Sequence, residues 1–360
     1  MCLSKEINRD PFNEVRYRWI KHQLNFKRPS GTSRGILKTK DSWFLIAEKQ
    51  DWKYPALGEV SIIEGLSPDV VNDIEPMLDQ LCDALAHNRE INTTNYPAIN
   101  FARESIELDI SSKGAKIFEN NPFTTGEDQI LINGLIWMGE AAYMLEQIKQ
   151  KVLDGFRCLK LKIGAINFEQ EIKILSWIRK EFNEDELEIR VDANGAFKPE
   201  TAMDKLNRLA EFQIHSIEQP IAPKQWSELA KLCKDTPINI ALDEELIGIK
   251  NQIEKNRCLD TIKPQYIILK PSLVGGFESS DEWIALAEER SIGWWITSAL
   301  ESNVGLNAIA QYAYSKKVHM PQGLGTGGLF TNNIDSPLYI HRQFLKMNPD
   351  HIWNLKPLNL

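Results

Sequence analysis

The sequence contains few cysteines and no pattern that would pair them. Its five cysteines are odd in number, and no two of them stand in a Cys-x-x-Cys arrangement. The six histidines likewise show no metal-ligand spacing. These features do not indicate a disulfide framework or a structural zinc site, and they fit reduced thiols in a cytoplasmic protein better.

The chain also lacks an excess of basic charge and any long hydrophobic run. Its formal net charge is −8, whereas a nucleic-acid-binding domain usually carries a basic patch. No stretch approaches the roughly 18 apolar residues that suggest a membrane-spanning helix. Residues 1–6 lack the apolar core of a secretory signal. We therefore expect no nucleic-acid or membrane partner and a cytoplasmic location.

The apolar content is sufficient for a large core. With 360 residues and 42% hydrophobic content, the chain is expected to form two domains or one large barrel with an addition. Residues 1–120 combine strand-like runs such as 43–47 with a helix-like tract at 70–87, which predicts a small α+β domain. Its polar segment 27–35 is either a ligand-contacting loop, with Ser30 and Thr32, or a solvated hairpin connection.

Five short apolar runs further along the chain each end in a charged residue. These residues follow one another at intervals of 25 to 30 positions and are Lys162, Asp192, Glu218, Asp243 and Lys270. Such an interval accommodates one strand, one helix and two loops. The spacing is therefore typical of a parallel βα repeat.

Extending this repeat in both directions predicts eight parallel strands alternating with helices. Strands are expected at residues 131–137, 159–163, 187–191, 214–217, 238–242, 266–269, 294–297 and 319–321. Helices are expected at residues 141–153, 168–182, 199–211, 225–234, 250–259, 280–290 and 304–316. Eight units favour an α/β fold with a TIM-type (β/α) barrel over residues 125–332.

The sequence leaves open where the C-terminal segment packs and whether the parallel sheet is closed or open. Residues 333–360 are expected to pack on the small domain or on the barrel. The competing architecture is an open doubly wound sheet, but the chain lacks the G-x-G-x-x-G turn after its first strand. An open sheet would also not usually gather chemistry from five successive strands, so the barrel is the preferred interpretation.

Three of the strand-end residues are carboxylates. Because barrel enzymes place their active groups at the C-terminal strand ends, Asp192, Glu218 and Asp243 are expected to converge. Unpaired, they would repel one another too strongly to remain ionised, and a hard divalent cation resolves that repulsion. All-oxygen ligation favours Mg²⁺, with Mn²⁺ as a substitute, over zinc or copper. Strand periodicity leaves Glu244 open as an alternative to Asp243.

The other strand-end residues are lysines. Lys160 and Lys162 are two positions apart, so they share one face of a strand whose other face is apolar. Packing does not explain two lysines that point into a barrel. A cation pair beside a metal is expected to lower the pKa of each lysine, as a general base near neutral pH requires. Lys270 would approach from the opposite side of the mouth.

These residues stand in segments that resemble the signatures of the enolase superfamily, in its muconate-lactonising-enzyme-like branch. The segments are Lys160-x-Lys162, Arg190-Val191-Asp192-Ala193-Asn194, Ile217-Glu218-Gln219-Pro220, Asp243-Glu244 and Leu269-Lys270-Pro271. Within that branch, residues 297–306 and 323–327 are similar to the o-succinylbenzoate synthase family of menaquinone biosynthesis. Residues 28–35 and Gly58-Glu59-Val60 match the capping domain of that family.

The resemblance implies a role for each strand-end residue. It implies Mg²⁺ ligation by Asp192, Glu218 and Asp243, and it is family position that selects Asp243 over Glu244. It further implies Lys162 as the catalytic base, Lys160 as its electrostatic partner and Lys270 as a cation across the substrate. The implied reaction is the dehydration of 2-succinyl-6-hydroxy-2,4-cyclohexadiene-1-carboxylate to o-succinylbenzoate through an enediolate.

Contacts with the small carboxylate substrate are expected on loops around the mouth. The candidates are Arg190, Asn194, Ser298, Leu300, Glu301, Gly325, Thr326, Ser30 and Thr32. The loop after the seventh strand is a backbone cradle for a carboxylate or an ordinary loop. The glycine-rich segment 323–328 stands where many barrels hold phosphate, but in this family it approaches a substrate carboxylate, and a plain tight turn is the alternative.

Two other functions fit the same residues. A dipeptide epimerase or N-acylamino acid racemase of the superfamily would use Lys162 and Lys270 on opposite faces of one carbon. A barrel that binds a carboxylate or metal without catalysis would be expected to lack a ligand or the base, and none is missing from this sequence.

Overall fold

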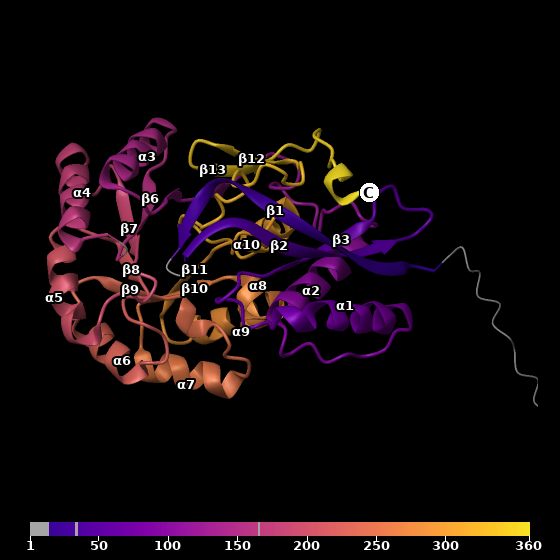
Figure 1. Cartoon of the computed structure of the whole chain (residues 1–360), viewed down its shortest axis with the longest axis horizontal. Coiled ribbons are helices and arrows are strands. Elements are labelled where there is room, and N and C mark those ends of the chain that lie inside the picture. Colours follow the sequence, from indigo (N-terminus) through magenta and orange to yellow (C-terminus); the bar gives the residue numbers. More distant parts are fainter. Residues whose placement is uncertain (1–13, 33–34, 165) are drawn as a thin grey trace, which may run out of the picture.

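The computed structural model of the chain describes residues 14–32, 35–164 and 166–360. Figure 1 shows an antiparallel sheet with two helices on one side of the molecule and a curved parallel sheet with outer helices on the other. This arrangement confirms the predicted α/β barrel with an N-terminal α+β cap. The sheet of the cap, β1 to β3, is called the capping sheet below.

The cap consists of three antiparallel strands and two helices. Its elements are β1 (Arg16–Thr32), β2 (Gly35–Glu48), β3 (Ala56–Ser61), α1 (Val71–Ala86) and α2 (Pro97–Ser111). Strand β2 alternates between two environments because successive side chains point to opposite faces. Trp43 and Leu45 pack on α1 and α2, whereas Phe44 and Ile46 pack on the C-terminal segment.

The barrel contains seven parallel strands in one continuous sheet, ordered β11-β10-β9-β8-β7-β6-β5. The strands are β5 (Gly134–Ile136), β6 (Cys158–Lys162), β7 (Glu188–Asp192), β8 (Ser216–Glu218), β9 (Asn239–Leu242), β10 (Tyr266–Leu269) and β11 (Gly293–Ile296). Successive strands are neighbours throughout, which is the strand order that a (β/α) barrel requires.

Helices alternate with these strands along the chain. They are α3 (Ala141–Leu153), α4 (Phe168–Glu181), α5 (Pro199–Ala210), α6 (Trp226–Asp235), α7 (Gln252–Ile262), α8 (Pro271–Val274), α9 (Gly276–Glu288) and α10 (Asn303–Ser315), with a 3-10 turn at Glu244–Leu246. Local signals set their starts. Asn167 caps α4 by accepting a hydrogen bond from the Glu169 N–H, and Ser302 caps α10 through the Val304 N–H.

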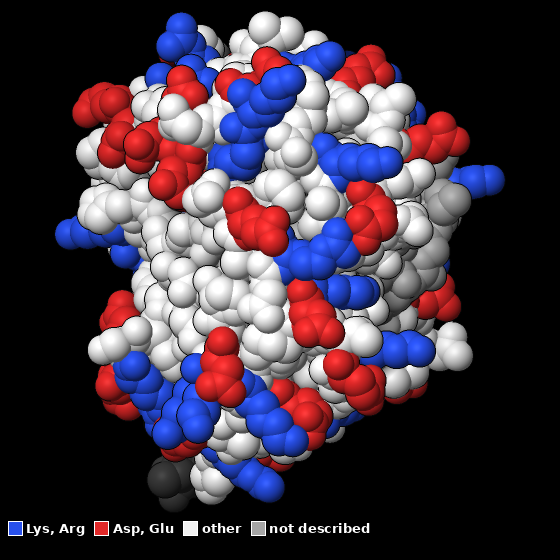
Figure 2. All heavy atoms as spheres, turned by 90° about the vertical axis from the view of Figure 1, so that its left-hand side faces the viewer, with Lys and Arg blue, Asp and Glu red and all other residues white. Residues whose placement is uncertain are grey.

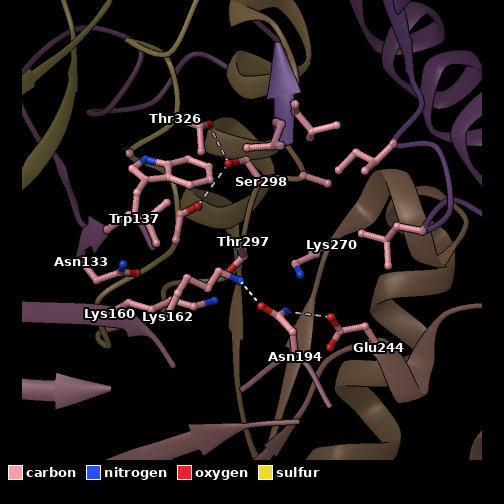
Figure 3. A pocket seen from close by; sticks show the side chains of 18 of the residues that line it. Asn133, Trp137, Lys160, Lys162, Asn194, Glu244, Lys270, Thr297, Ser298 and Thr326 are labelled. Carbon is pink, nitrogen blue, oxygen red and sulfur yellow. Dashed lines mark hydrogen bonds between the residues drawn. The ribbon is translucent and has the colours of Figure 1, made fainter. Parts of the chain in front are cut away.

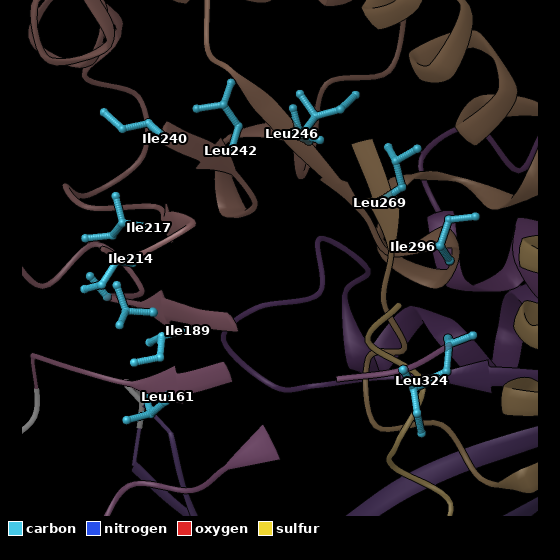
Figure 4. Packing of buried hydrophobic residues seen from close by; sticks show 14 of the residues in the cluster. Leu161, Ile189, Ile214, Ile217, Ile240, Leu242, Leu246, Leu269, Ile296 and Leu324 are labelled. Carbon is cyan, nitrogen blue, oxygen red and sulfur yellow. The ribbon is translucent and has the colours of Figure 1, made fainter. Parts of the chain in front are cut away.

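The strands separate apolar from charged side chains by simple alternation. Figure 4 shows Leu161, Ile189, Ile217 and other branched residues in one buried cluster between the strands and the outer helices. The alternate positions of the same strands therefore face the barrel interior. In this way the apolar cluster directs Lys160, Lys162 and the strand-end carboxylates inward.

The eighth predicted strand, at residues 319–321, is wrong as a strand. The chain closes the barrel here with two isolated parallel bridges, Ile132 to Gln322 and Thr297 to Gly323. Proline has no backbone N–H to donate to a ladder, so Pro321 cannot belong to a regular inner strand. The first predicted strand is also divided, because β4 (Ile130–Leu131) pairs antiparallel with a C-terminal strand and only β5 joins the barrel.

The C-terminal segment contacts both parts of the molecule. Its strands β12 (Leu338–His341) and β13 (Phe344–Met347) form a hairpin that pairs with β4 beside the barrel. Further on, Leu355 packs with Phe44 and Leu57 of the capping sheet, next to a 3-10 turn at Lys356–Leu358. The segment thus links the cap to the barrel.

The outer surface formed by the barrel helices carries charges of both signs. Figure 2 shows lysine and arginine side chains interspersed with aspartate and glutamate on this face. Among the described residues, no helix is long and apolar enough to cross a bilayer.

Candidate active site

A cavity lies where the C-terminal ends of the barrel strands meet the cap. Its polar lining residues are Glu64, Asn133, Lys160, Lys162, Asn194, Glu244, Lys270, Thr297, Ser298 and Thr326. Its apolar and glycine lining comprises Leu37, Ile63, Leu66, Leu135, Trp137, Ala299, Leu300, Gly323 and Gly325. Figure 3 shows Lys160 and Lys162 entering from one side and Lys270 from the other, with Asn194 between them.

Three carboxylates form a buried group beside the lysines that line the cavity. Asp192 and Glu218 end β7 and β8, and Asp243 directly follows β9, so that each is fixed by a strand end. One oxygen of each lies within 4.8 Å of the others, an arrangement that could hold a metal ion. The strand register explains the convergence, since Lys162 is aligned with Asp192 and Asp192 with Glu218 across neighbouring strands.

The lysines form ion pairs with this carboxylate group. The Lys160 ammonium contacts Asp192 at 3.0 Å and also Glu218, while the Lys162 ammonium contacts Asp192. Lys270 forms a direct ion pair with Asp243. Each of the three carboxylates therefore has at least one lysine beside it, and Asp192 has two.

Uneven pairing produces opposite pKa shifts in the two neighbouring acids. Burial disfavours the ionised form of Asp192, but Lys160 and Lys162 outweigh it and hold the pKa of Asp192 below its usual range. Burial raises the pKa of Glu218 to about 8, and Asp192 and Asp243 add to the effect while Lys160 opposes it. Glu218 is the acid whose charge is less completely compensated.

The lowered lysine pKa was expected beside a bound metal; with the protein groups alone, the pKa of Lys160 is raised. Burial favours its neutral form, but the carboxylates of Asp192 and Glu218 contact its ammonium directly and raise its pKa. The pKa of Lys270 is also raised, because Asp243 and Glu244 outweigh its burial. In both cases the carboxylates, rather than neighbouring cations, determine the direction of the shift.

The carboxylate group fits a hard divalent cation on its own geometry. The Glu218 Oε1 atom is buried and has no hydrogen-bond partner among the described residues, although it belongs to the group that could hold a metal ion. An unpartnered carboxylate oxygen within an all-oxygen ligand set is suited to a cation such as Mg²⁺.

Asn194 connects the base candidate to the neighbouring acid. Its Oδ1 accepts a hydrogen bond from Lys162 Nζ at 2.9 Å, and its Nδ2 donates to Glu244 Oε1 at 2.8 Å. The Asn194 backbone has a left-handed φ of 44°, and its N–H donates to Asp192 Oδ1 at 3.0 Å. Glu244 therefore lines the cavity and is hydrogen-bonded to Asn194, whereas Asp243 belongs to the carboxylate group.

Comparisons with known proteins agree with this geometry. A protein-family model described as "Enolase C-terminal domain-like" matches residues 143–342. The o-succinylbenzoate synthase of Desulfotalea psychrophila is 47% identical over 361 aligned residues, which cover 91% of this chain and 97% of the relative. The chain belongs to the o-succinylbenzoate synthase family of the enolase superfamily.

Solved structures place this family member among related barrels. The crystal structure of MenC from Desulfotalea psychrophila has a TM-score of 0.84 at 43% identity, covering 93% of this chain and all of that one. The L-Ala-D/L-Glu epimerase of Bacillus subtilis has a TM-score of 0.79 at 17% identity, covering 93% of this chain and 96% of that one. The second likeness shows a shared fold alone.

Most of the predicted substrate contacts in this enolase superfamily member line the cavity. They are Asn194, Ser298, Leu300, Gly325 and Thr326. The hydroxyl groups of Ser298 and Thr326 lie 2.7 Å apart, which joins the loop after β11 to the glycine-rich segment (Figure 3).

Two predicted contacts are placed elsewhere. Arg190 lies below the carboxylates inside the barrel, where it donates to Glu188 and to the Pro321 carbonyl and stacks on Trp295. Glu301 is fully buried and accepts a hydrogen bond from the Ala299 N–H, so its side chain bonds to its own loop. Neither side chain is part of the cavity lining.

The remaining two predicted contacts, Ser30 and Thr32, belong to the end of β1, and their side chains lie outside the described residues.

Sequence reasoning missed lining residues from both parts of the chain. Trp137 follows the first barrel strand, β5, where the strand-end rule could have found it, whereas Asn133 precedes that strand. Ile63 and Leu66 follow the capping sheet and stand in no motif.

Proposed function

We propose that the protein is a Mg²⁺-dependent o-succinylbenzoate synthase. It would dehydrate 2-succinyl-6-hydroxy-2,4-cyclohexadiene-1-carboxylate to o-succinylbenzoate through an enediolate, as a hydro-lyase of menaquinone biosynthesis. The observation that carries the choice of reaction is the 47% identity to a synthase of that name over nearly the whole of both chains. The buried carboxylate group and its three lysines support the chemistry.

Asp192, Glu218 and Asp243 would hold the Mg²⁺ ion through their converging oxygens. When bound, the ion supplies positive charge that stabilises the two oxygens of an enediolate. The three carboxylates stand on strand ends packed into the barrel, so their positions are fixed before substrate binds.

Lys162 would act as the base. Its neutral ε-amine takes the proton from the carbon next to the substrate carboxylate, and the electron pair of that C–H bond becomes part of the enediolate. When the carbon–oxygen bond to the hydroxyl breaks, the Lys162 ammonium returns the proton to the leaving oxygen. One water leaves, the amine is regenerated, and both steps occur on one face as a syn elimination.

The other two lysines would contribute charge. Lys160 lies two residues from Lys162 on the same strand face and stays a cation through its contacts with Asp192 and Glu218. Lys270 lines the cavity opposite Lys162 and pairs with Asp243, so it would present a cation across the substrate (Figure 3). Both charges favour the enediolate, because it carries more negative charge than the starting carboxylate.

The cavity walls suit a ring with polar substituents. Leu135, Trp137 and Leu300 offer apolar surface to the cyclohexadiene ring. The paired hydroxyls of Ser298 and Thr326 are suited to hydrogen bonds with a carboxylate of the substrate.

A second candidate function, epimerisation of a dipeptide or N-acylamino acid, is supported by the position of Lys270. Two lysines on opposite sides of one cavity suit removal of a proton from one face and its return to the other (Figure 3). The two functions differ in what they demand of Lys270, because a syn elimination needs a base on one face only.

Lys270→Arg is therefore expected to retain measurable dehydration of the cyclohexadiene carboxylate. Arginine keeps the cation but cannot readily deprotonate, so it preserves the charge across the substrate and removes any basic role. The measurement is o-succinylbenzoate formation by purified Lys270→Arg, with Lys263→Arg as a matched control outside the cavity lining.

An epimerase would respond differently to the same change. In that case Lys270→Arg would abolish α-proton exchange into D₂O from one enantiomer of a dipeptide or N-acylamino acid. Complete loss of dehydration in Lys270→Arg, with that exchange lost in parallel, would argue against the one-base assignment.

A further inference from the structure

A carboxylate of the capping sheet holds the start of a barrel helix. Glu59 of β3 is fully buried, and its two oxygens accept hydrogen bonds from different backbone N–H groups. Its Oε1 accepts from the Ser302 N–H and its Oε2 from the Gly305 N–H, both at 2.9 Å. Ser302 caps α10 of the barrel. Glu59 of the capping sheet therefore places a negative charge at the N-terminus of a barrel helix.

The backbone that Glu59 holds is continuous with the cavity wall. The segment from Ser298 to Ser302, here called the wall loop, contributes Ser298, Ala299 and Leu300 to the cavity lining. Leu300 adopts a left-handed φ of 62°, which a branched residue adopts only when its surroundings impose it. The wall loop thus requires anchors at both ends.

Three further hydrogen bonds hold the wall loop. Its Glu301 accepts a hydrogen bond from the Ala299 N–H at 2.6 Å and another from the Ser272 hydroxyl at the start of the α8 segment. At the entry to the loop, the Ser298 N–H donates to the Gly323 carbonyl at 3.0 Å. From the cap, Ile63 packs against Ala299 of this loop, and Glu59 adds a hydrogen-bonding anchor.

One buried lysine balances the charge of this anchor. Lys40 of β2 is 5% exposed, and its ammonium donates to the Ser42 hydroxyl at 2.9 Å. The same hydroxyl donates to Glu59 Oε1 at 2.9 Å, so that a serine bridges the two charges. A buried carboxylate is stable only when hydrogen-bonded and paired in this way.

We propose that Glu59 is a positioning residue, which fixes the wall loop against substrate from the capping sheet while Lys40 balances its buried charge. The inference rests on the proposed function, because it assigns to the cap a part in orienting the substrate of that reaction. Glu59 itself does not line the cavity and acts through the wall loop.

The geometry specifies why an amide cannot replace this carboxylate. Each oxygen of Glu59 accepts from one backbone N–H, and an amide offers only one accepting atom. In Glu59→Gln, either orientation of the amide turns its NH₂ group toward one of the two buried N–H donors. The hydroxyls of Ser42 and Ser302, which donate to Glu59 Oε1 and Oε2, can rotate to accept instead, but a backbone N–H cannot.

The test compares Glu59→Gln with Glu104→Gln. Glu104 is a matched control, because this cap residue on α2 also accepts from backbone N–H groups at a barrel helix start, those of Phe277 and Glu278 on α9. Among the described residues, its side chain bonds to Asn100, Phe277 and Glu278 and to none of the wall loop. Glu59→Gln is expected to lower kcat/KM for the cyclohexadiene carboxylate by about 10²-fold, the loss that misplaced substrate causes. Glu104→Gln is expected to keep parental turnover.

Two further readouts in Glu59→Gln do not depend on activity. Amide hydrogen exchange at Ser302 and Gly305 is expected to accelerate, because one of these N–H groups loses its acceptor. Mg²⁺ affinity is expected to stay at the parental value, because Glu59 is not part of the carboxylate group.

The double variant Lys40→Met/Glu59→Gln separates positioning from stability. Lys40→Met alone leaves the buried carboxylates of Glu59 and Glu301 without the lysine that faces both. The double variant also removes the charge of Glu59 and is therefore expected to be thermally more stable than Lys40→Met. Turnover is expected to stay low, because the unpaired N–H remains. Recovery of full turnover together with stability would overturn the inference, as would parental kcat/KM in Glu59→Gln.

Failure of the inference is distinguishable from failure of the proposed function. If the parent protein does not dehydrate the cyclohexadiene carboxylate, the proposed reaction is wrong. The claim that Glu59 helps to orient that substrate then fails as well. Faster amide exchange at Ser302 and Gly305 in Glu59→Gln would still show that Glu59 holds the wall loop. If the parent is active and exchange in Glu59→Gln is unchanged, the inference alone is overturned.

Discussion

Replacing Lys162 by alanine is expected to lower dehydration by at least about 10³-fold, because it removes the group proposed to take the proton and return it to the leaving hydroxyl. Lys162 lines the cavity and contacts Asp192 and Asn194, so its side chain is held in place before substrate arrives. The measurement is kcat for o-succinylbenzoate formation by Lys162→Ala and parent protein at saturating Mg²⁺.

Two control variants distinguish loss of the base from loss of the positive charge and from a nonspecific effect of the substitution. Lys162→Arg keeps a cation without a usable base and is expected to be nearly as inactive as Lys162→Ala. Lys173→Ala changes an exposed lysine of α4 and is expected to keep parental turnover. If Lys162→Arg retained most of the activity, Lys162 would act through charge alone and the base would have to be sought elsewhere.

Removal of divalent metal is expected to abolish turnover, and Mg²⁺ or Mn²⁺ is expected to restore it. The proton next to a carboxylate is weakly acidic, and the enediolate formed by its loss is too basic to accumulate without a cation at its oxygens. The measurement is turnover after treatment with EDTA and after titration with each metal. Full activity in metal-free buffer would contradict the mechanism.

The ligand set can be tested separately from turnover. Asp192→Asn is expected to weaken Mg²⁺ binding, measured by calorimetry, because it removes one formal charge from the three-carboxylate group. Its circular dichroism is expected to stay near that of the parent. Asp185→Asn, in the exposed turn before β7, is the matched control and is expected to bind Mg²⁺ normally. Normal Mg²⁺ binding by Asp192→Asn would show that Asp192 is not a ligand.

The centre of the site was accessible from the sequence because strand geometry is regular. Lys162, Asp192 and Glu218 each close a short apolar run, and parallel strands in register bring such positions into one row. The alternation of apolar and charged residues also fixed which face each side chain takes, as the cluster around Leu161 and Ile189 shows. Local periodicity therefore predicted both the barrel and the convergence of its charged residues.

The contributions of the cap were not accessible in this way. Ile63 and Leu66 reach the cavity because the cap lies over the strand ends, and no local pattern encodes that contact. Glu301 illustrates the same difficulty, since its place in a loop suggested a substrate contact while its side chain bonds to Ala299 and Ser272. Such positions depend on contacts between segments far apart in the sequence.

Two strand predictions failed where regular pairing is interrupted. Residues 319–321 were predicted as the eighth strand, but Pro321 lacks an N–H and closure passes to single bridges at Gln322 and Gly323. The first strand was predicted as continuous over residues 131–137. It divides because β4 pairs with β13, a partner more than 200 residues away whose pairing no local pattern specifies.

The mass of the reaction product tests the proposed dehydration most directly. The purified protein, with Mg²⁺, would be incubated with 2-succinyl-6-hydroxy-2,4-cyclohexadiene-1-carboxylate in D₂O and followed by mass spectrometry, with Lys162→Ala alongside. The proposed function predicts loss of one water and formation of o-succinylbenzoate by the parent protein only. Recovery of the substrate without loss of water, together with hydrogen exchange or epimerisation of a dipeptide or N-acylamino acid by the same preparation, would contradict it.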